Sequence, residues 1–230
     1  MNEPEIPTQM IQRALQFAQD SNFSAALGWF QKALAGFQAQ GDLQGEARAL
    51  NGLVNTYIQL ADYPAALQAL YQSIDSCQKI GNEQGKYRAL VGIAVIYQKT
   101  SDYERSLSLS EEVIAYADRI GFKELKASSM SNAGKVEALM GDSERAERYF
   151  NSSLQLCQEV GDKAGEARLL HNIGAFYLEI KKINEAHHML TQALLKRQEI
   201  DDKYGEAHTS LMLGFWHLRA TRQNHSETTP

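Results

Sequence analysis

The sequence predicts an all-α protein, a solenoid of antiparallel helix pairs stacked in series. Three observations support this prediction: a helix-forming composition, a pattern that returns every 40 residues, and apolar positions at helical spacing inside each repeat. The 230 residues include four prolines and sixteen glycines, and 43% of them are hydrophobic. A chain of this composition can bury a core and favours helix along most of its length.

The 40-residue repeat is clearest at the glycines. Gly41, Gly81, Gly121 and Gly161 follow one another at this interval, and Asp201 takes the next place. No insertion or deletion disturbs the register, so each block of 40 residues is one structural unit. Further positions in phase with the repeat are Gly45, Gly85, Gly165 and Gly205; Tyr57, Tyr97 and Tyr177; and Ala26, Ala66, Ala146 and Ala186.

Each unit contains two helical segments with their own boundary residues. In the second unit, residues 47–60 and 66–77 each carry an apolar stripe at helical spacing. Pro64 is acceptable between them because it falls in the first turn of a helix. Gly81 is expected to close a helix in the left-handed conformation. The predicted N-caps are Asp42, Asn82 and Asp162.

One helix pair of this kind cannot bury both of its apolar stripes, so neighbouring pairs must stack. The recurring alanines are expected where two helix backbones approach closely, and Gly134, Gly174 and Gly214 are expected to serve the same purpose. The tyrosines in phase with the repeat would fill the space between pairs.

These columns resemble the tetratricopeptide repeat, whose pattern is a bulky residue, then L-G-x-x-Y, then a small alanine followed four residues later by an aromatic or aliphatic one. In this sequence the pattern appears as Leu170, Ile173-Gly174, Tyr177, Ala186 and Leu190. The period of 40 exceeds the usual value of about 34 and resembles the long-helix subclass of kinesin light chains and spindle-orientation adaptors. The resemblance implies a right-handed superhelix, with the first helix of each pair on the concave wall.

The pattern places five helix pairs and one C-terminal helix in a single domain over residues 8–220. Residues 1–7 and 221–230 are expected to be disordered because they contain little apolar surface. The expected helices are 8–19 with 23–39, 43–60 with 64–79, 84–99 with 103–119, 124–140 with 143–159, 164–180 with 183–199, and finally 204–219.

In proteins that this chain resembles, fixed positions of the first helix line a peptide-binding groove. Carried over to this sequence, the expected groove residues are Arg48, Asn51, Asn55, Gln59, Arg88, Val91, Val95, Lys99, Ser128, Ser131, Lys135, Arg168, His171, Glu179, His208, Leu211 and Phe215.

An arginine recurs at one groove position, at Arg48, Arg88 and Arg168. Guanidinium groups suit carboxylates, so this column predicts an acidic peptide partner. The alternative is that each arginine pairs with a nearby carboxylate such as Glu46 or Glu166 and joins neighbouring helix pairs. Both interpretations require the same residue type, so both stay open at this point.

Other function classes fit the sequence poorly. The net charge of −5 argues against nucleic-acid binding, and no apolar run is long enough to span a membrane. His187 and His188 lack further residues at metal-ligand spacing, and no nucleophile pairs with His171. We therefore expect no enzyme activity, no metal and no cofactor, and a cytoplasmic location.

The last helix is apolar on more than one face. Leu211, Phe215, Trp216 and Leu218 are the residues that a second copy, in a homodimer through this helix, or another partner would cover. The alternative is a lone capping helix whose exposed residues are tolerated. The leading function is a non-enzymatic adaptor that holds an extended or helical protein segment in its groove. The alternatives are a bacterial receptor for a regulatory peptide and an assembly factor that acts through the C-terminal helix.

Overall fold

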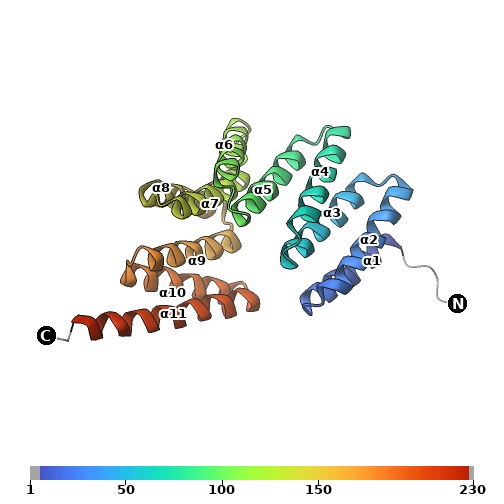
Figure 1. Ribbon diagram of the computed structural model, residues 1–230. Coiled ribbons are helices and arrows are strands. Elements are labelled where there is room, and N and C mark those ends of the chain that lie inside the picture. The colour runs from blue at the N-terminus through green and yellow to red at the C-terminus, as the bar shows by residue number, and fades with distance from the viewer. Residues whose placement is uncertain (1–5, 228–230) are drawn as a thin grey trace. The chain divides into compact units, whose positions relative to one another are not determined.

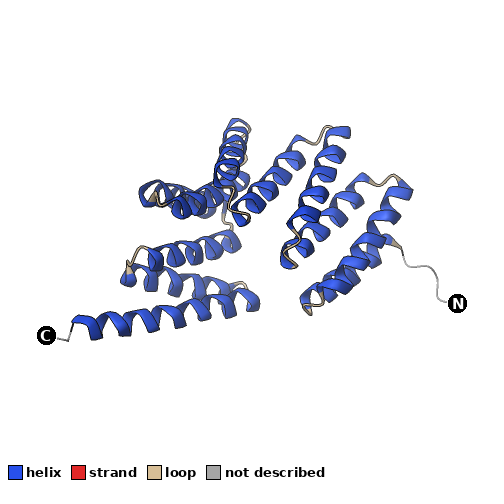
Figure 2. Ribbon diagram, in the orientation of Figure 1, coloured by secondary structure: helices blue, strands red, loops and turns tan. Residues whose placement is uncertain are grey.

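The structure is a computed structural model that describes residues 6–227 and, of these, the side chains of residues 6–218. The described chain forms eleven α-helices and contains no strand (Figures 1 and 2). The predicted fold class, an all-α repeat of five helix pairs and a final helix, is confirmed. The helices are α1 (Pro7–Gln19), α2 (Phe23–Gln40), α3 (Leu43–Gln59), α4 (Tyr63–Lys79), α5 (Glu83–Lys99), α6 (Tyr103–Arg119), α7 (Lys123–Met140), α8 (Ser143–Val160), α9 (Lys163–Glu179), α10 (Ile183–Glu199) and α11 (Lys203–Glu227).

Every helix-to-helix turn has the same construction. A residue with a positive φ angle follows each helix, and these residues recur at intervals of 20 from Ser21 to Asp201. Gly81 is one of them, with a φ of +67°, as the sequence predicts. The next residue usually caps the following helix: the side-chain oxygens of Asp42, Asn82 and Asp162 accept from backbone N–H groups at 2.9, 2.9 and 2.8 Å. The predicted caps are confirmed.

The helices group into two compact units, Met1–Leu109 and Ser110–Pro230, and the division falls within α6. The single domain that the sequence predicts stays a prediction, and each unit is described here by itself.

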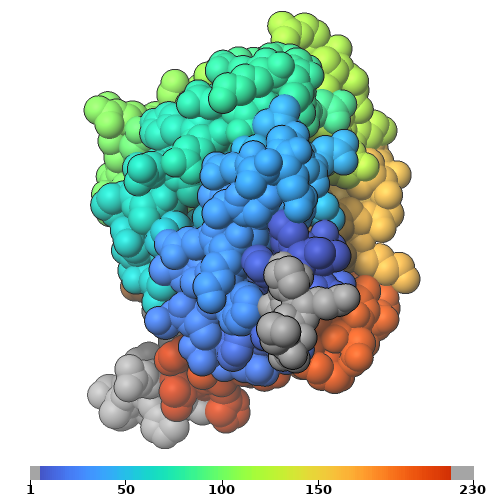
Figure 3. Space-filling view, turned by 90° about the vertical axis from the view of Figure 1, so that its right-hand side faces the viewer, coloured from blue at the N-terminus to red at the C-terminus, as the bar shows by residue number. Residues whose placement is uncertain are grey.

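Unit 1 has a core of aliphatic and aromatic side chains from successive helices. Phe30 of α2 and Leu50 of α3 are almost completely buried, and Ile93 and Ile96 continue the core on α5. Gly52 lies against the Phe30 ring, where a Cβ atom would meet the ring at 2.2 Å. In the space-filling view of Figure 3, the side chains of α1 to α4, coloured blue to teal, fill the spaces that separate the ribbons in Figure 1.

Unit 2 has a core of the same kind. Phe150 of α8 and Phe176 of α9 pack with their ring centroids 5.5 Å apart. Ile173 and Leu190 close the space between α9 and α10. In Figure 1, α9, α10 and α11 lie side by side, and α10 packs against both of the others.

The alanines and glycines that recur with the repeat have two kinds of surroundings. The in-phase alanines are completely buried, and a Cβ on Gly174 would lie 2.6 Å from Leu190 Cγ and 3.3 Å from the Ala186 carbonyl oxygen. Close backbone approach is therefore confirmed there. Gly214 holds the same place on α11, but no atom lies within 4 Å of its Cβ position. The close approach expected at Gly214 is wrong for the chain by itself.

The last helix is longer than expected. α11 continues to Glu227, so residues 221–227 are helical where the sequence predicts a disordered tail. Residues 228–230 lie outside the described part of the chain, as do residues 1–5 of the expected N-terminal tail. The prediction of a disordered tail depended on composition alone. A helix that has already formed gains one hydrogen bond for each residue that it adds, and composition does not include this effect.

Candidate functional site

The positions expected to line a groove form an exposed stripe on α3. Arg48, Asn51, Asn55 and Gln59 follow at intervals of three or four residues, and all four side chains are exposed. This spacing puts them on one face of the helix, while the buried residues of α3 occupy the other faces.

The same face of α5 is less polar. Arg88 and Lys99 are exposed at its two ends, and Val91 and Val95 are half-buried between them. We call the exposed polar residues of these two helices the unit 1 surface: Arg48, Asn51, Asn55, Gln59, Arg88 and Lys99.

In unit 2 the expected groove residues differ in exposure. Arg168 of α9 and His208 of α11 are exposed, and Lys135 of α7 is half-buried. His171, in contrast, is only 6% exposed. The sequence puts His171 on the groove wall, but α11 packs over that face of α9, so His171 is an interior residue.

Arg168 does not form the expected ion pair with Glu166. The Glu166 carboxylate instead accepts from Lys196 of α10, with Oε2 3.1 Å from Nζ, and from Gln158 of α8 at 3.1 Å. Among the described residues, no carboxylate lies at ion-pair distance from Arg168 or from Arg48. The Arg48 guanidinium lies over the Phe37 ring, 5.7 Å from its centroid. These two arginines therefore keep their hydrogen-bond donors available to a ligand.

The buried His171 joins α9 to α11. Its Nδ1 lies 3.2 Å from the Thr209 hydroxyl, and its ring stacks on His208 with the centroids 4.6 Å apart. Burial, and after it the nearby charges of His208, Arg197 and Lys135, together lower the pKa of His171 to about 4. His171 is thus neutral at pH 7 and stabilises the contact between the two helices.

Arg197 is a buried cation that sequence reasoning missed. In other repeats its column holds Phe37, Cys77 and Cys157, whereas Arg197 is 7% exposed and pairs with Asp202 at 3.3 Å. Its Nε has no hydrogen-bond partner in the described structure, and burial lowers the pKa of the guanidinium. Gly205 makes room for it, because a Cβ there would meet the guanidinium. The available signal in the sequence was a charged residue at a repeat position that is apolar in the other repeats.

Glu137 is a second buried charged residue, and comparison of equivalent positions in the repeats could have singled it out. It replaces the tyrosine of the other repeats and is 1% exposed. Arg145 of α8 lies 3.0 Å from its carboxylate and also contacts Glu111 of α6 at 3.4 Å. Burial raises the pKa of Glu137, and the attraction of Arg145 opposes that rise. The tyrosine at the same place in the next repeat, Tyr177, donates to Glu147 at 2.7 Å.

Unit 1 has an open hollow of about 350 Å³ between α4, α5 and α6. Leu90, Ile93 and Leu109 supply its apolar lining, and Arg105 lies beside it with its guanidinium 5.6 Å from the Tyr97 ring. On α5, Leu90 and Tyr97 face away from Arg88 and Lys99, because about 100° separates successive residues of a helix. The hollow is thus separate from the unit 1 surface.

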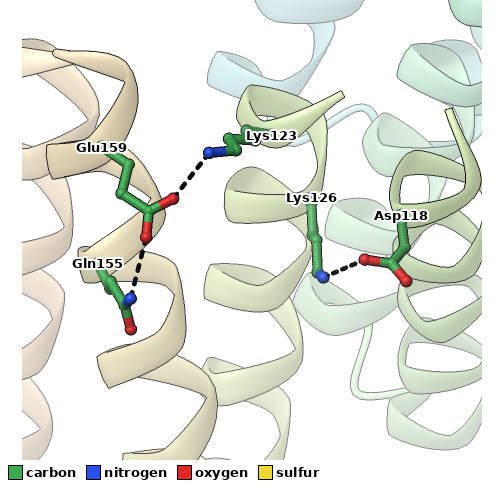
Figure 4. A network of polar contacts seen from close by, with 5 residues as sticks. All are labelled: Asp118, Lys123, Lys126, Gln155 and Glu159. Carbon is green, nitrogen blue, oxygen red and sulfur yellow. Dashed lines mark hydrogen bonds and ion pairs between the residues drawn. The ribbon is translucent and has the colours of Figure 1, made fainter. Parts of the chain in front are cut away.

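Several lysines of unit 2 are engaged in internal ion pairs (Figure 4). Lys123 donates from α7 to Glu159 of α8 at 2.9 Å, and Gln155 donates to the other oxygen of the same carboxylate at 2.9 Å. Lys126 pairs with Asp118 of α6. These contacts join successive helices, which is the role that the sequence left open for the arginine column.

The apolar residues of α11 lie on two different faces. Trp216 is half-buried, donates from its indole N–H to the Ile183 carbonyl at 2.8 Å and stacks on His187. It therefore anchors α11 to α10 and is not part of an open surface, contrary to the expectation. Leu211, Phe215 and Leu218 are 59%, 50% and 59% exposed.

Two further observations bear on chemistry. Over the described residues, no group of three or more His, Cys, Asp or Glu side chains is placed to hold a metal ion, and no helix there is long and apolar enough to cross a membrane. Cys77 and Cys157 are buried free thiols, and burial raises the pKa of each.

Solved structures of several proteins resemble this fold. NprR in complex with its cognate peptide NprX has a TM-score of 0.75 at 18% identity, with 96% of this chain and 66% of that chain covered. BtubC (BKLC) from P. vanneervenii has a TM-score of 0.63 at 16% identity, with 95% and 85% covered. A putative kinesin light chain from Podosopora anserina, with nearly identical TPR-like repeats, has a TM-score of 0.58 at 15% identity, with 86% and 99% covered. At these identities the likeness concerns the fold.

Family models give a more direct assignment, although no curated protein matches the sequence. Two models described as tetratricopeptide repeat match the chain, one at residues 47–80 and the other at residues 86–159 and 135–199. The matches follow the same repeats as the capped helix pairs of the structure. This chain belongs to the tetratricopeptide-repeat family.

Proposed function

We propose that this protein is a non-enzymatic adaptor that binds an acidic, extended segment of a partner protein on the exposed polar faces of its first helices. The tetratricopeptide fold supports binding of a protein or peptide in general. The observation that favours an acidic segment is that Arg48 of unit 1 and Arg168 of unit 2, at the same repeat position, have no carboxylate partner among the described residues.

The neighbouring side chains support an extended segment. Asn51 and Asn55 follow Arg48 on α3, and an amide side chain can both donate to and accept from a peptide backbone. An arginine fork that meets a carboxylate adds two parallel hydrogen bonds. The unit 1 surface thus combines charge recognition with backbone recognition. A cytoplasmic location is part of this proposal and is compatible with the two free thiols.

Binding to a fluorescent acidic peptide library tests the proposal. Arg48→Glu should weaken binding of peptides that bind unit 1, and Arg168→Glu binding of peptides that bind unit 2, at least about tenfold, because each replaces an attractive charge with a repulsive one. The matched control is Arg148→Glu on α8, which changes an exposed arginine outside the proposed surfaces. Equal binding by all three variants and the unchanged protein would contradict the proposal.

A receptor for a short regulatory peptide is the second candidate. It is favoured by the likeness to NprR, whose structure contains a cognate peptide. Such a receptor changes conformation when the peptide binds. Small-angle scattering with and without the selected peptide distinguishes the two functions, because an adaptor keeps its radius of gyration and a receptor changes it.

A further inference from the structure

The last helix carries an exposed stripe with the spacing of a coiled coil. Tyr204, His208, Leu211, Phe215 and Leu218 follow at intervals of four, three, four and three residues. We call these five residues the α11 seam. Tyr204 is 81% exposed, the other apolar members are 50–59% exposed, and His208 is exposed as well.

The apolar members of the seam face away from the rest of unit 2, whereas the His208 ring lies against His171 of α9. Thr209, Met212, Leu213 and Trp216 lie on the other side of α11, where they pack against α9 and α10. The helix therefore has two apolar faces, and its own unit covers one of them.

The preceding repeat shows what kind of element fits the seam. Leu211 and Leu218 lie 40 residues after His171 and Leu178, which are 6% and 3% exposed. His171 is buried because another helix, α11, lies against it. Leu211 thus occupies a position that a helix covers one repeat earlier, which favours a helix as the partner of this part of the seam. Ala164 and Arg168, the equivalents of Tyr204 and His208, are exposed in that repeat.

The spacing defines how that helix would lie. Alternation of three and four residues has a mean period of 3.5, which keeps a stripe in contact with a partner helix that crosses at about 20°. The four apolar seam residues are each at least half exposed, and a contiguous exposed apolar patch of this kind marks an interaction surface. A pair of such stripes forms the centre of a standard dimer interface of about 800 Å² per partner.

We propose that the α11 seam binds the α11 seam of a second copy of this chain, with the two helices antiparallel. A two-fold axis near residue 213 places Leu211 against Phe215 of the second copy and His208 against Leu218 of the second copy. A parallel pair would instead place each His208 beside its own equivalent. The seam has no acidic or basic member other than His208, so it offers little to a charged peptide and matches a copy of itself.

Two small residues beside the seam support close approach of a second helix. Ala207 and Gly214 flank it, and the Cβ position of Gly214 has open space around it. A glycine inside a helix is destabilising relative to alanine, and among the described residues no contact accounts for the glycine here. A second backbone passing beside Gly214 gives it the role that Gly174 has against α10.

Light scattering after size exclusion tests this proposal at tens of micromolar protein. The unchanged protein should have twice the 25.7 kDa mass of the chain, and the double variant Leu211→Glu with Leu218→Glu should have the mass of one chain. Leu195→Glu on α10 is the matched control, because Leu195 is 55% exposed and lies outside the seam. It should remain a dimer. A monomeric unchanged protein, or a double variant that remains a dimer, would overturn the proposal.

Two more experiments test which face of α11 forms the dimer and whether the two helices are antiparallel. Trp216→Phe removes the hydrogen bond to Ile183 and should lower thermal stability without changing the mass. Loss of the dimer in this variant would overturn the separation of the two faces. Chains with Leu211→Cys should cross-link to chains with Phe215→Cys faster than to one another, and the reverse preference would overturn the antiparallel arrangement.

Discussion

Gly174 and Gly214 occupy the same repeat position, but substitution by alanine should change stability in opposite directions. Alanine is better than glycine inside a helix by about 0.8–1.0 kcal/mol at either position. At Gly174 the new Cβ would lie 2.6 Å from Cγ of Leu190, which is completely buried and cannot move without separating α9 from α10. Overpacking of this kind costs about 1–3 kcal/mol.

The net result at Gly174 should be a destabilisation of up to about 2 kcal/mol, because the steric cost exceeds the gain in helix propensity. At Gly214 no atom of the described residues lies within 4 Å of the new Cβ, so in the monomeric Leu211→Glu, Leu218→Glu background Gly214→Ala should stabilise the protein by about 1 kcal/mol. In the dimer the new Cβ would instead oppose the close approach of the second helix. Urea unfolding followed by circular dichroism measures both changes, and the slopes with urea should stay equal. Stabilisation of the same size by both variants would refute the close approach of α9 and α10.

The turns and the buried histidine give the remaining predictions. Ala61 has a φ of +56°, a conformation that costs an L-residue about 1–2 kcal/mol. Ala61→Gly should therefore raise the free energy of unfolding by about 1 kcal/mol. Gly141→Ala should lower the free energy of unfolding, because Gly141 has a φ of +90°. Because the pKa of His171 falls from 6.5 to about 4 on folding, the unfolded chain binds the proton first, and stability should decrease as pH falls from 6.5 towards 4. His171→Gln should flatten this part of the stability profile in thermal melts at successive pH values, and an unchanged slope would contradict the assignment.

Much of the fold could be predicted because the helix-boundary residues and the 40-residue periodicity agree along this chain. A left-handed residue recurs every 20 residues, and a capping side chain follows it at most turns. Helix ends were therefore predicted to within one residue except at the end of α11. Local chemistry alone fixes such turns: the caps of Asp42 and Asn82 bond N–H groups only three residues away.

The site could be predicted less completely because exposure depends on neighbouring helices. The repeat register correctly places Arg48 and Arg168 at solvent, but it also places His171 there, and only the packing of α11 over α9 buries it. Likewise, Trp216 and Phe215 are adjacent apolar residues in the sequence, and the hydrogen bond to Ile183 separates their roles.

The sequence by itself determined the repeat length, the helix pairs, the caps and the family, because these depend on spacing along the chain and on contacts within a few residues. Only the tertiary structure decided which charges are paired, as with Lys196 rather than Arg168 at Glu166, and which apolar face of α11 stays open. The reason is physical: a side chain's partners are set by which helices lie against it, and the same residue type serves as an internal contact or as a binding group in different surroundings.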